Sequence, residues 1–213
     1  MILQSTSQAG QDVFAFEMCG QRTDGTFLDV GSYNLTSMNN TYALEQMGWS
    51  GLLFDILCDA DRIQNRTSKF IQGDTTKTDW LAVIDEAGLP RIIDFLSLDC
   101  DDATLDTFSN IPFGTLRFSV ATIEHDRYRI GDEPRDRMRL AMKEYGYDLA
   151  CADVVIPDYG ETEDWWCFPG SVNADLIKRV RCEGRPWSEI VSKLTRAADG
   201  ERGLARLTIN TGG

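Results

Sequence analysis

The chain has 213 residues, 42% of them hydrophobic, which is enough for one sizeable core and one globular domain. It carries 34 acidic against 21 basic residues, a formal net charge of −13, so its long-range field repels nucleic-acid phosphates and anionic lipid heads. No stretch reaches the roughly 18 to 20 apolar residues of a membrane span, and the first residues lack a secretion signal. We therefore expect a cytoplasmic protein with no nucleic-acid partner and no membrane span.

Hydrophobic periodicity predicts helices and strands that alternate along the chain. In chain order the predicted elements are helix 7–19, strand 26–30, helix 38–47, strand 52–57, helix 59–66, strand 69–74, helix 79–88, strand 91–99, helix 102–109, strand 116–124, helix 133–147, strands 148–156 and 164–168, and helices 171–181 and 186–197. Strands separated by helices predict a doubly wound α/β fold with a mostly parallel, seven-stranded sheet. The last two strands have no helix between them, which predicts a final antiparallel hairpin.

This pattern predicts a single domain, 1–213, in three parts. Residues 1–20 form an N-terminal helical cap, 21–169 the α/β core, and 170–213 the C-terminal helices and tail. The sequence leaves the oligomeric state open.

An acidic residue stands at the end of each of the first five predicted strands: Asp29, Asp55, Asp74, Asp99 and Glu124. In open sheets of this type, ligands bind beyond the carboxyl ends of the strands, where the strand order reverses. A row of carboxylates at one edge repels itself unless a cation lies there, because like charges raise one another's pKa. The row therefore predicts a cationic cofactor or a metal, although exposure to water explains an acid at any single strand end.

The segment after the first strand has features of a nucleotide-type loop. Gly31 would let the backbone approach a ligand without a Cβ in the way. Asp55 follows 24 residues later, close to the ~20-residue spacing at which a carboxylate meets a ribose diol. The strict GxGxxG pattern is absent, so this motif alone does not identify the ligand.

Five segments between about residues 7 and 169 resemble, in sequence and order, the FkbM family of S-adenosylmethionine (SAM)-dependent methyltransferases. They are SQAGQDVF, FLDVGSYNLTSMNNTYALEQMGWSGLLFDI, IDFLSLDCDD, ATIEHDRYRIGDEPRDRMR and EDWWCFP. The resemblance implies the seven-stranded, Rossmann-like class I methyltransferase sheet. It also implies O-methylation of a sugar, a glycan or a small natural product.

The resemblance further implies a set of cofactor-binding residues: Asp29, Gly31 and Ser32 in the loop, Asp55 at the ribose diol, Asp74 at the adenine side, and Gln11. Leu35 departs from the family's DxGxxxG loop. Because leucine does not adopt a positive φ cheaply, a reshaped loop is expected there.

Methyl transfer to a hydroxyl needs a base or a metal near the acceptor oxygen. Hard oxygen ligands for Mg²⁺ or Mn²⁺ are predicted at adjacent strand ends: Asp99, Asp101, Glu124 and Asp126. Such an ion lowers the pKa of a bound sugar diol. His125, the single histidine of the chain, is predicted to be the catalytic proton acceptor together with Asp99, with a structural histidine as the alternative. Asp101 or Asp102 would instead cap helix 102–109.

Four residues are predicted to contact the acceptor. Arg127 and Arg129 follow the acidic cluster and would meet an anionic group of the substrate. Trp165 and Trp166 alternate across a strand, so one is expected in the core and the other at the rim, where it would stack on a sugar.

The first hypothesis is thus a metal-assisted, SAM-dependent O-methyltransferase acting on a small-molecule or glycan acceptor. Two alternatives remain open. The Asp-x-Asp of FLSLDCDD is also typical of metal-dependent glycosyltransferases that use nucleotide-sugars, although the loop at Gly31 and the carboxylate of Asp55 would then have no role. Leu35 motivates the other alternative, a non-catalytic binding module with the same fold.

Overall fold

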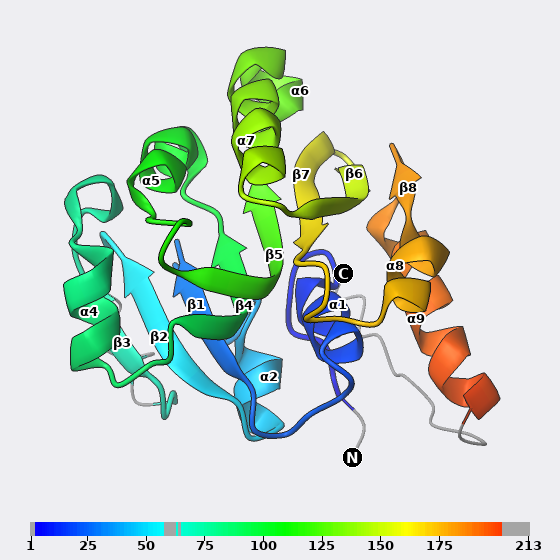
Figure 1. The fold of residues 1–213 in the computed structure, drawn as a ribbon, viewed down its shortest axis with the longest axis horizontal. Helices are drawn as coiled ribbons and strands as arrows, with labels where there is room; N and C mark the ends of the chain where they lie inside the picture. Colours follow the sequence, from blue (N-terminus) through cyan, green and yellow to red (C-terminus); the bar gives the residue numbers. More distant parts are fainter. Residues whose placement is uncertain (1–2, 58–62, 64, 202–213) are drawn as a thin grey trace.

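A mixed β-sheet of eight strands forms the centre of the computed structural model (Figure 1), which describes residues 3–57, 63 and 65–201, and their side chains up to residue 195. The strands are β1 (Thr26–Val30), β2 (Ser50–Asp55), β3 (Lys69–Gln72), β4 (Ile92–Leu98), β5 (Arg117–Glu124), β6 (Asp148–Ile156), β7 (Gly160–Cys167) and β8 (Cys182–Glu183). Their order is β3-β2-β1-β4-β5-β7-β6-β8. Strands β1 to β5 are parallel and β7 is antiparallel to β5 and β6. The predicted doubly wound fold with a final antiparallel hairpin is confirmed.

The structure differs from the sequence prediction at the β8 edge of the sheet. An eighth strand, β8, pairs parallel with β6 through Cys151 and Cys182. Two residues are too few to show the alternation by which strands are found in a sequence. Strand β7 also begins at Gly160, earlier than the predicted start at Asp164. The prediction missed the first half of this strand because that half is polar.

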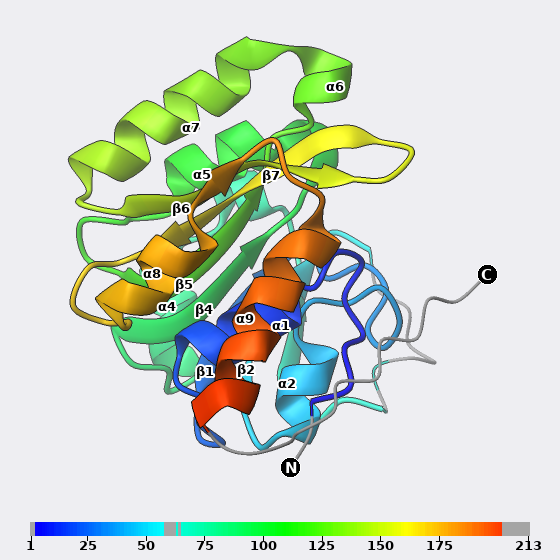
Figure 2. The same cartoon turned by 90° about the vertical axis from the view of Figure 1, so that its right-hand side faces the viewer.

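The described helices cover both faces of the sheet. They are α1 (Gln11–Met18), α2 (Tyr42–Gln46), α4 (Trp80–Glu86), α5 (Thr104–Asn110), α6 (Arg127–Ile130), α7 (Asp132–Glu144), α8 (Ala174–Val180) and α9 (Trp187–Glu201), with 3-10 turns at Thr75–Lys77 and Asp101–Ala103. Helices α4, α5 and α7 lie on one face, and α1, α2 and α9 on the other (Figures 1 and 2). Most of the predicted helix 59–66 lies outside the described residues. None of the described helices is long and apolar enough to cross a membrane.

Alternation along each strand divides the core into two layers, because successive side chains of a strand point to opposite faces. Phe27, Phe95 and Trp165 pack with the layer under α1, α2 and α9. Their neighbours Leu28 and Leu96 pack under α4, α5 and α7. The sheet is thus buried on both sides, and its functional groups are left to the strand ends.

Trp165 and Trp166 follow this alternation and face opposite layers, as expected. Both, however, are buried, with 0% and 1% of their surface exposed. The expectation that one of them reaches the rim and stacks on a sugar is therefore wrong. Trp165 instead packs against Phe14 of α1, with ring centroids 4.8 Å apart.

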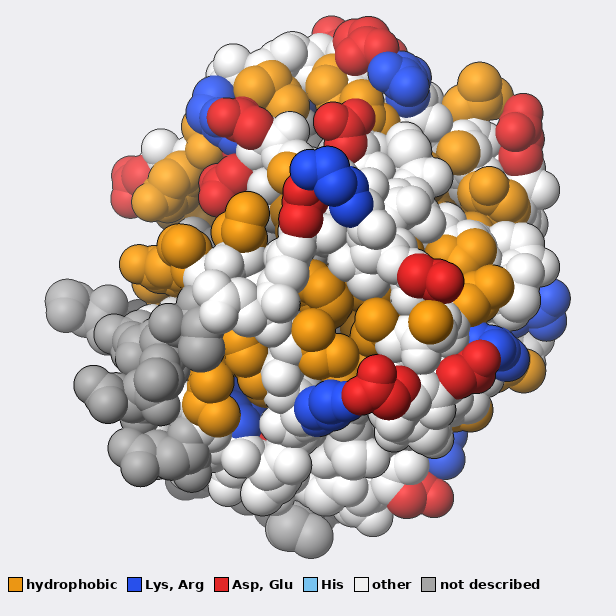
Figure 3. Space-filling model, turned by 90° about the vertical axis from the view of Figure 1, so that its left-hand side faces the viewer, with side chains coloured by type: hydrophobic (Ala, Val, Ile, Leu, Met, Phe, Trp, Pro, Cys, Tyr) orange, Lys and Arg blue, Asp and Glu red, His pale blue; other side chains and the backbone are white. Residues whose placement is uncertain are grey.

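The other edge of the sheet, at β3 and α4, faces the viewer in Figure 3, where hydrophobic side chains lie among acidic and basic ones. Lys69 at the start of β3 pairs with Glu86 at the end of α4, with Nζ and Oε1 2.7 Å apart. Charged side chains at an edge strand discourage pairing with another chain.

Candidate functional site

A cavity of about 660 Å³ opens at the carboxyl ends of the parallel strands, around the point between β1 and β4 where the strand order reverses. It is lined by eleven of the residues singled out in the sequence: Gln11, Asp29, Gly31, Ser32, Asp55, Asp74, Asp99, Asp101, Glu124, Asp126 and Arg129. This is the position at which open α/β sheets bind their ligands. His125, Arg127, Trp165 and Trp166 do not line it.

Gly31 is required by the protein's own backbone. Its φ is 87°, and a Cβ there would lie 1.5 Å from the carbonyl oxygen of Asp99, at the end of β4. The amides of Gly31 and Ser32 both donate to the carbonyl oxygen of Phe54, at 2.8 and 3.2 Å. The glycine thus lets β1, β2 and β4 come together at the floor of the cavity. The expected reason for a glycine here was different, namely the close approach of a ligand to the backbone.

Leu35 is 1% exposed and belongs to the core under α1 and α2. It does not adopt a positive φ; in this loop the positive φ values belong to Gly31, at 87°, and Met38, at 50°. The leucine therefore anchors the loop through its buried side chain. The loop needs no glycine at this position.

Asp29 holds the same loop from beneath. It is 2% exposed and accepts hydrogen bonds from Asn39 Nδ2 at 3.1 Å and Thr41 Oγ1 at 2.7 Å. Burial raises the pKa of this carboxyl, and these hydrogen bonds together with the charge of Arg66 counteract the rise. Arg66 itself donates to Asn39 and Thr41, at 3.0 Å in each case.

Asp55 and Asp74 stand at the β2 and β3 side of the cavity. The two carboxylate oxygens of Asp55 accept the amides of Tyr33 at 2.7 Å and Leu57 at 2.8 Å, which fixes the carboxylate in place. Asp74 accepts from Lys77 Nζ at 2.6 Å and Thr76 Oγ1 at 2.6 Å. These hydrogen bonds lower the pKa of Asp74 to about 2, so it is ionised at neutral pH.

The end of β5 is bent, and the bend directs two acids toward the cavity. The amides of His125 and Asp126 both donate to the carbonyl oxygen of Thr162, at 2.7 and 3.0 Å, and Asp126 has a φ of 44°. Two consecutive residues opposite one partner make a bulge-like kink, which re-aims side chains at a strand end. Glu124 and Asp126 therefore line the cavity, and His125 between them does not.

Carboxylate oxygens of Asp101, Glu124 and Asp126 lie within 4.8 Å of one another. Glu124 Oε2 accepts the amide of Asp101 at 3.0 Å. Burial raises the pKa of both Asp99 and Glu124, and the charge of Asp99 raises that of Glu124 further. Three hard carboxylate oxygens at this spacing fit a divalent cation such as Mg²⁺ or Mn²⁺, whose charge would favour the ionised carboxylates.

Arg129 of α6 is the one basic side chain among the described residues that line the cavity. Its Nε donates to Asp126 Oδ2 at 2.9 Å and its Nη1 to Asp102 Oδ1 at 2.6 Å. Arg127 points elsewhere and pairs with Asp132 at 2.6 Å. Of the two arginines predicted to contact substrate, the structure brings only Arg129 to the site.

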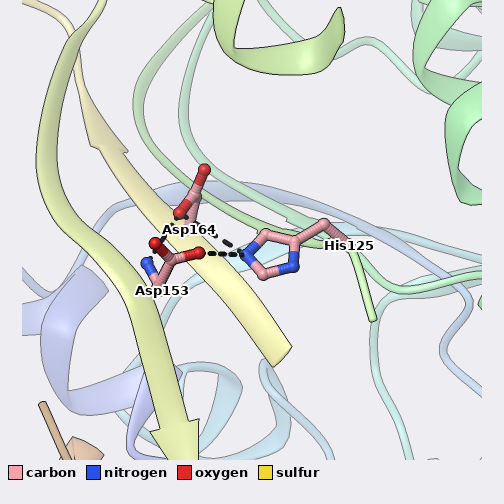
Figure 4. A group of neighbouring side chains, drawn as sticks. All are labelled: His125, Asp153 and Asp164. Carbon is pink, nitrogen blue, oxygen red and sulfur yellow. Dashed lines mark hydrogen bonds and ion pairs between the residues drawn. The ribbon is translucent and has the colours of Figure 1, made fainter. Parts of the chain in front are cut away.

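His125 is 2% exposed and its ring points into a buried network behind the cavity (Figure 4). Its Nδ1 accepts the amide of Arg127 at 3.2 Å, and its Nε2 lies 3.5 Å from Asp164 and 3.6 Å from Asp153. Both ring nitrogens therefore face protein atoms. The prediction that His125 takes the proton of an acceptor in the cavity is wrong, and the structural alternative fits its surroundings.

His125, Asp153 and Asp164 also have the spacing of a metal site. Arg139, however, already donates to the same oxygens, at 2.6 Å to Asp164 Oδ1 and 3.0 Å to Asp153 Oδ1. A guanidinium on these atoms leaves no room for a second cation.

Glu163 of β7 lines the cavity and was missed by sequence reasoning. It is paired with Glu124 across β5 and β7, and its Oε1 accepts from Gln11 Nε2 at 3.0 Å. Burial raises the pKa of Glu163 to about 8. The segment Gly-Glu-Thr-Glu before Asp164 is polar throughout, so it carries no alternation by which the sequence could have indicated Glu163.

No family model matches the sequence, and no curated protein does. Among solved structures, a putative rRNA methylase from Clostridium thermocellum covers 78% of this chain and 97% of its own, with 14% identity and a TM-score of 0.51. CalO1, a methyltransferase in calicheamicin biosynthesis in its SAH-bound form, covers 76% and 54%, with 15% identity and a TM-score of 0.38. Aeropyrum pernix fibrillarin with natively bound SAM covers 75% and 76%, with 14% identity and a TM-score of 0.42. The first likeness shows a Rossmann-like methyltransferase fold.

Proposed function

We propose that the protein is a SAM-dependent methyltransferase that modifies a hydroxyl of a small-molecule or glycan acceptor, assisted by a divalent metal. The observation that carries this proposal is the cavity itself. It lies at the switch point of a methyltransferase-type sheet and gathers the acids at the carboxyl ends of β1 to β5 into one site. The FkbM-like segments of the sequence support the same function.

The β1 to β4 half of the cavity fits the cofactor. Asp55, held by two backbone amides, would accept from a ribose diol, and Asp74, which lines the same cavity, would lie on the adenine side. Gln11 and Ser32 supply polar groups beside them. When bound, SAM would supply an electrophilic methyl group on a sulfonium, and the negative charge of this site favours such a cation.

The acceptor would occupy the β4 to β7 half. There Asp101, Glu124 and Asp126 would hold the divalent ion, with Asp99 hydrogen-bonded to Glu124. Such an ion would bring the hydroxyl closer to ionisation. Glu163 takes the place of His125 as the proposed proton acceptor, alongside Asp99, because it faces the cavity; with a pKa of about 8 it would accept a proton in its ionised form, which predominates above that pH.

Calorimetric titration tests this function. SAM and S-adenosylhomocysteine (SAH) are titrated with and without Mg²⁺ or Mn²⁺ into the wild type, Asp55→Ala, and Asp106→Ala, an exposed control outside the cavity. We expect binding of both adenosyl ligands, weakened at least about tenfold in Asp55→Ala by the lost charge-assisted hydrogen bonds.

A parallel titration with UDP-sugars separates the alternatives. Metal-dependent binding of a UDP-sugar without adenosyl binding would favour the glycosyltransferase, since Asp99 and Asp101 both line the cavity. Absence of binding by every ligand would favour the non-catalytic module.

A further inference from the structure

The mouth of the cavity is apolar. Of the ten large hydrophobic side chains exposed among the described residues, six line this cavity: Tyr33, Met38, Ile56, Leu57, Tyr128 and Tyr159. Their exposed fractions range from 45% to 67%. Exposed apolar groups gathered at one opening mark a binding surface, whereas scattered ones are normal.

These six residues form two separate walls. One wall follows β1 and β2 and borders the half that we assign to the cofactor. The other consists of Tyr128 on α6 and Tyr159 in the β6–β7 turn, with Ile156 at the end of β6 below them. The two tyrosine rings meet edge to face, with centroids 6.1 Å apart at 71°.

The β6–β7 turn holds this tyrosine pair together. Gly160 has a φ of 100°, and a Cβ there would lie 3.4 Å from Cβ of Tyr128. A residue with a side chain would be strained at this φ, and its Cβ would be in ordinary van der Waals contact with Tyr128, so the turn runs against α6. The wall is built by the fold and lines the same cavity as Glu124 and Glu163.

The charge of the cavity limits what can bind against this wall. Eight acids line the cavity, namely Asp29, Asp55, Asp74, Asp99, Asp101, Glu124, Asp126 and Glu163, against Arg129 as the one basic side chain among the described lining residues. Arg129 already pairs with Asp102 and Asp126. One divalent ion would leave the site negative, so phosphate or carboxylate groups on an acceptor would be repelled.

We propose that the acceptor is a non-anionic compound whose hydroxyl group is carried by a flat apolar ring, and that this ring packs against Tyr128 and Tyr159. The proposal rests on the proposed function and narrows it: it rejects sugar phosphates, nucleotides and nucleic acid as acceptors. It also changes the expected role of Arg129, which holds Asp102 and Asp126 in place and does not meet a substrate anion.

Binding to the SAH-loaded protein with Mg²⁺ tests this inference. The probes are 4-methylcatechol, dopamine, 3,4-dihydroxybenzoate and glucose 6-phosphate, which compare neutral, cationic and anionic rings with an anionic sugar. We expect 4-methylcatechol and dopamine to bind about tenfold or more tightly than 3,4-dihydroxybenzoate, and glucose 6-phosphate not to bind.

Variants test the wall itself. Tyr128→Ala and Tyr159→Ala should each weaken binding of 4-methylcatechol about three- to tenfold, while Tyr128→Phe and Tyr159→Phe retain it because the ring remains. Leu140→Ala, an exposed position on α7 outside the cavity, is the control and should bind as the wild type does. Thermal melting of each variant shows that it is folded.

Equal affinity for 4-methylcatechol and 3,4-dihydroxybenzoate would overturn the inference, as would unchanged binding by both alanine variants or no binding of any ring compound. If SAH binds and the rings do not, the inference fails and the proposed function stands. If rings bind through the two tyrosines but SAH does not bind, the proposed function fails and the ring site remains.

Discussion

Two groups of acids lie back to back at the end of β5, and they differ in how their charge is balanced. Behind the strand, Asp153 and Asp164 are matched by the guanidinium groups of Arg135 and Arg139. In front of it, the acids around Glu124 meet only Arg129 among the described cavity residues. A buried acid with a basic partner depends on that partner for the stability of the fold. Acids without basic partners in a cleft indicate a binding site for a ligand. The comparison supports a structural role for the first group and the proposed functional role for the second.

The largest expected effect comes from removing a basic partner of the buried acids Asp153 and Asp164. Arg139→Met leaves Asp164 buried without its bidentate partner, and removing one member of a buried pair costs about 3 to 5 kcal/mol of unfolding free energy. Arg137→Met is the matched control, because Arg137 is exposed and pairs with Glu133 within one helix, so its loss should cost below about 0.5 kcal/mol. Urea denaturation measures both; equal losses would show that the network does not stabilise the fold.

The pH dependence of stability tests the cavity acids, which have few basic partners. The folded pKa of Glu163, about 8, lies above the ordinary value, so folding favours its protonated form. This contribution to stability is complete below the ordinary glutamate pKa and is lost as the pH rises toward 8, by an amount on the order of a few kcal/mol. Glu163→Gln should remove most of this decline, whereas Glu144→Gln, at an exposed position of α7, should keep it. Denaturation at pH 5, 6, 7 and 8 measures the difference, and parallel curves for all three proteins would contradict it.

The next largest effect is expected on the affinity for a divalent metal ion. Glu124→Gln removes one carboxylate of the cluster and should weaken Mn²⁺ binding at least about tenfold, while Asp153→Asn, on the paired side, should leave the affinity of folded protein nearly unchanged. Mn²⁺ binding is followed by electron paramagnetic resonance of the free ion. A loss of Mn²⁺ affinity in Asp153→Asn but not in Glu124→Gln would instead indicate that the metal binds at His125, Asp153 and Asp164.

The smallest effect is expected at His125. His125→Gln removes two weak contacts inside the paired network and should cost about 1 to 2 kcal/mol of unfolding free energy. Methyl transfer by the folded variant should stay close to that of the wild type. An inactive variant of unchanged stability would restore the histidine as the catalytic base.

The sequence is sufficient to predict the order of the longer helices and strands, though not β8, and the acids at the ends of the first five strands, because these strands follow a local pattern. Asp55 and Asp99 reach one cavity simply because parallel strands end at the same edge. His125 lies one residue from two cavity acids, and alternation along the strand turns its side chain to the side opposite Glu124. The kink at Thr162, after which Asp126 lines the cavity, depends on pairing between segments far apart in the chain, which a local pattern does not encode.

Glu163 and Gly31 illustrate the same limit. Glu163 belongs to a polar half-strand, and its side chain is buried, with Gln11 from the N-terminal part of the chain donating to it. Gly31 was correctly singled out, but the contact that requires it is with the backbone of Asp99 on another strand. Long-range packing therefore determined the details of the site that periodicity did not predict.

Titration of SAH into the wild type, Asp55→Ala and His125→Gln tests the central claim most directly. The account predicts saturable one-to-one binding to the wild type, nearly the same affinity in His125→Gln, and a loss of about tenfold or more in Asp55→Ala. No binding of SAH by the wild type, or full binding by Asp55→Ala with none by His125→Gln, would contradict it.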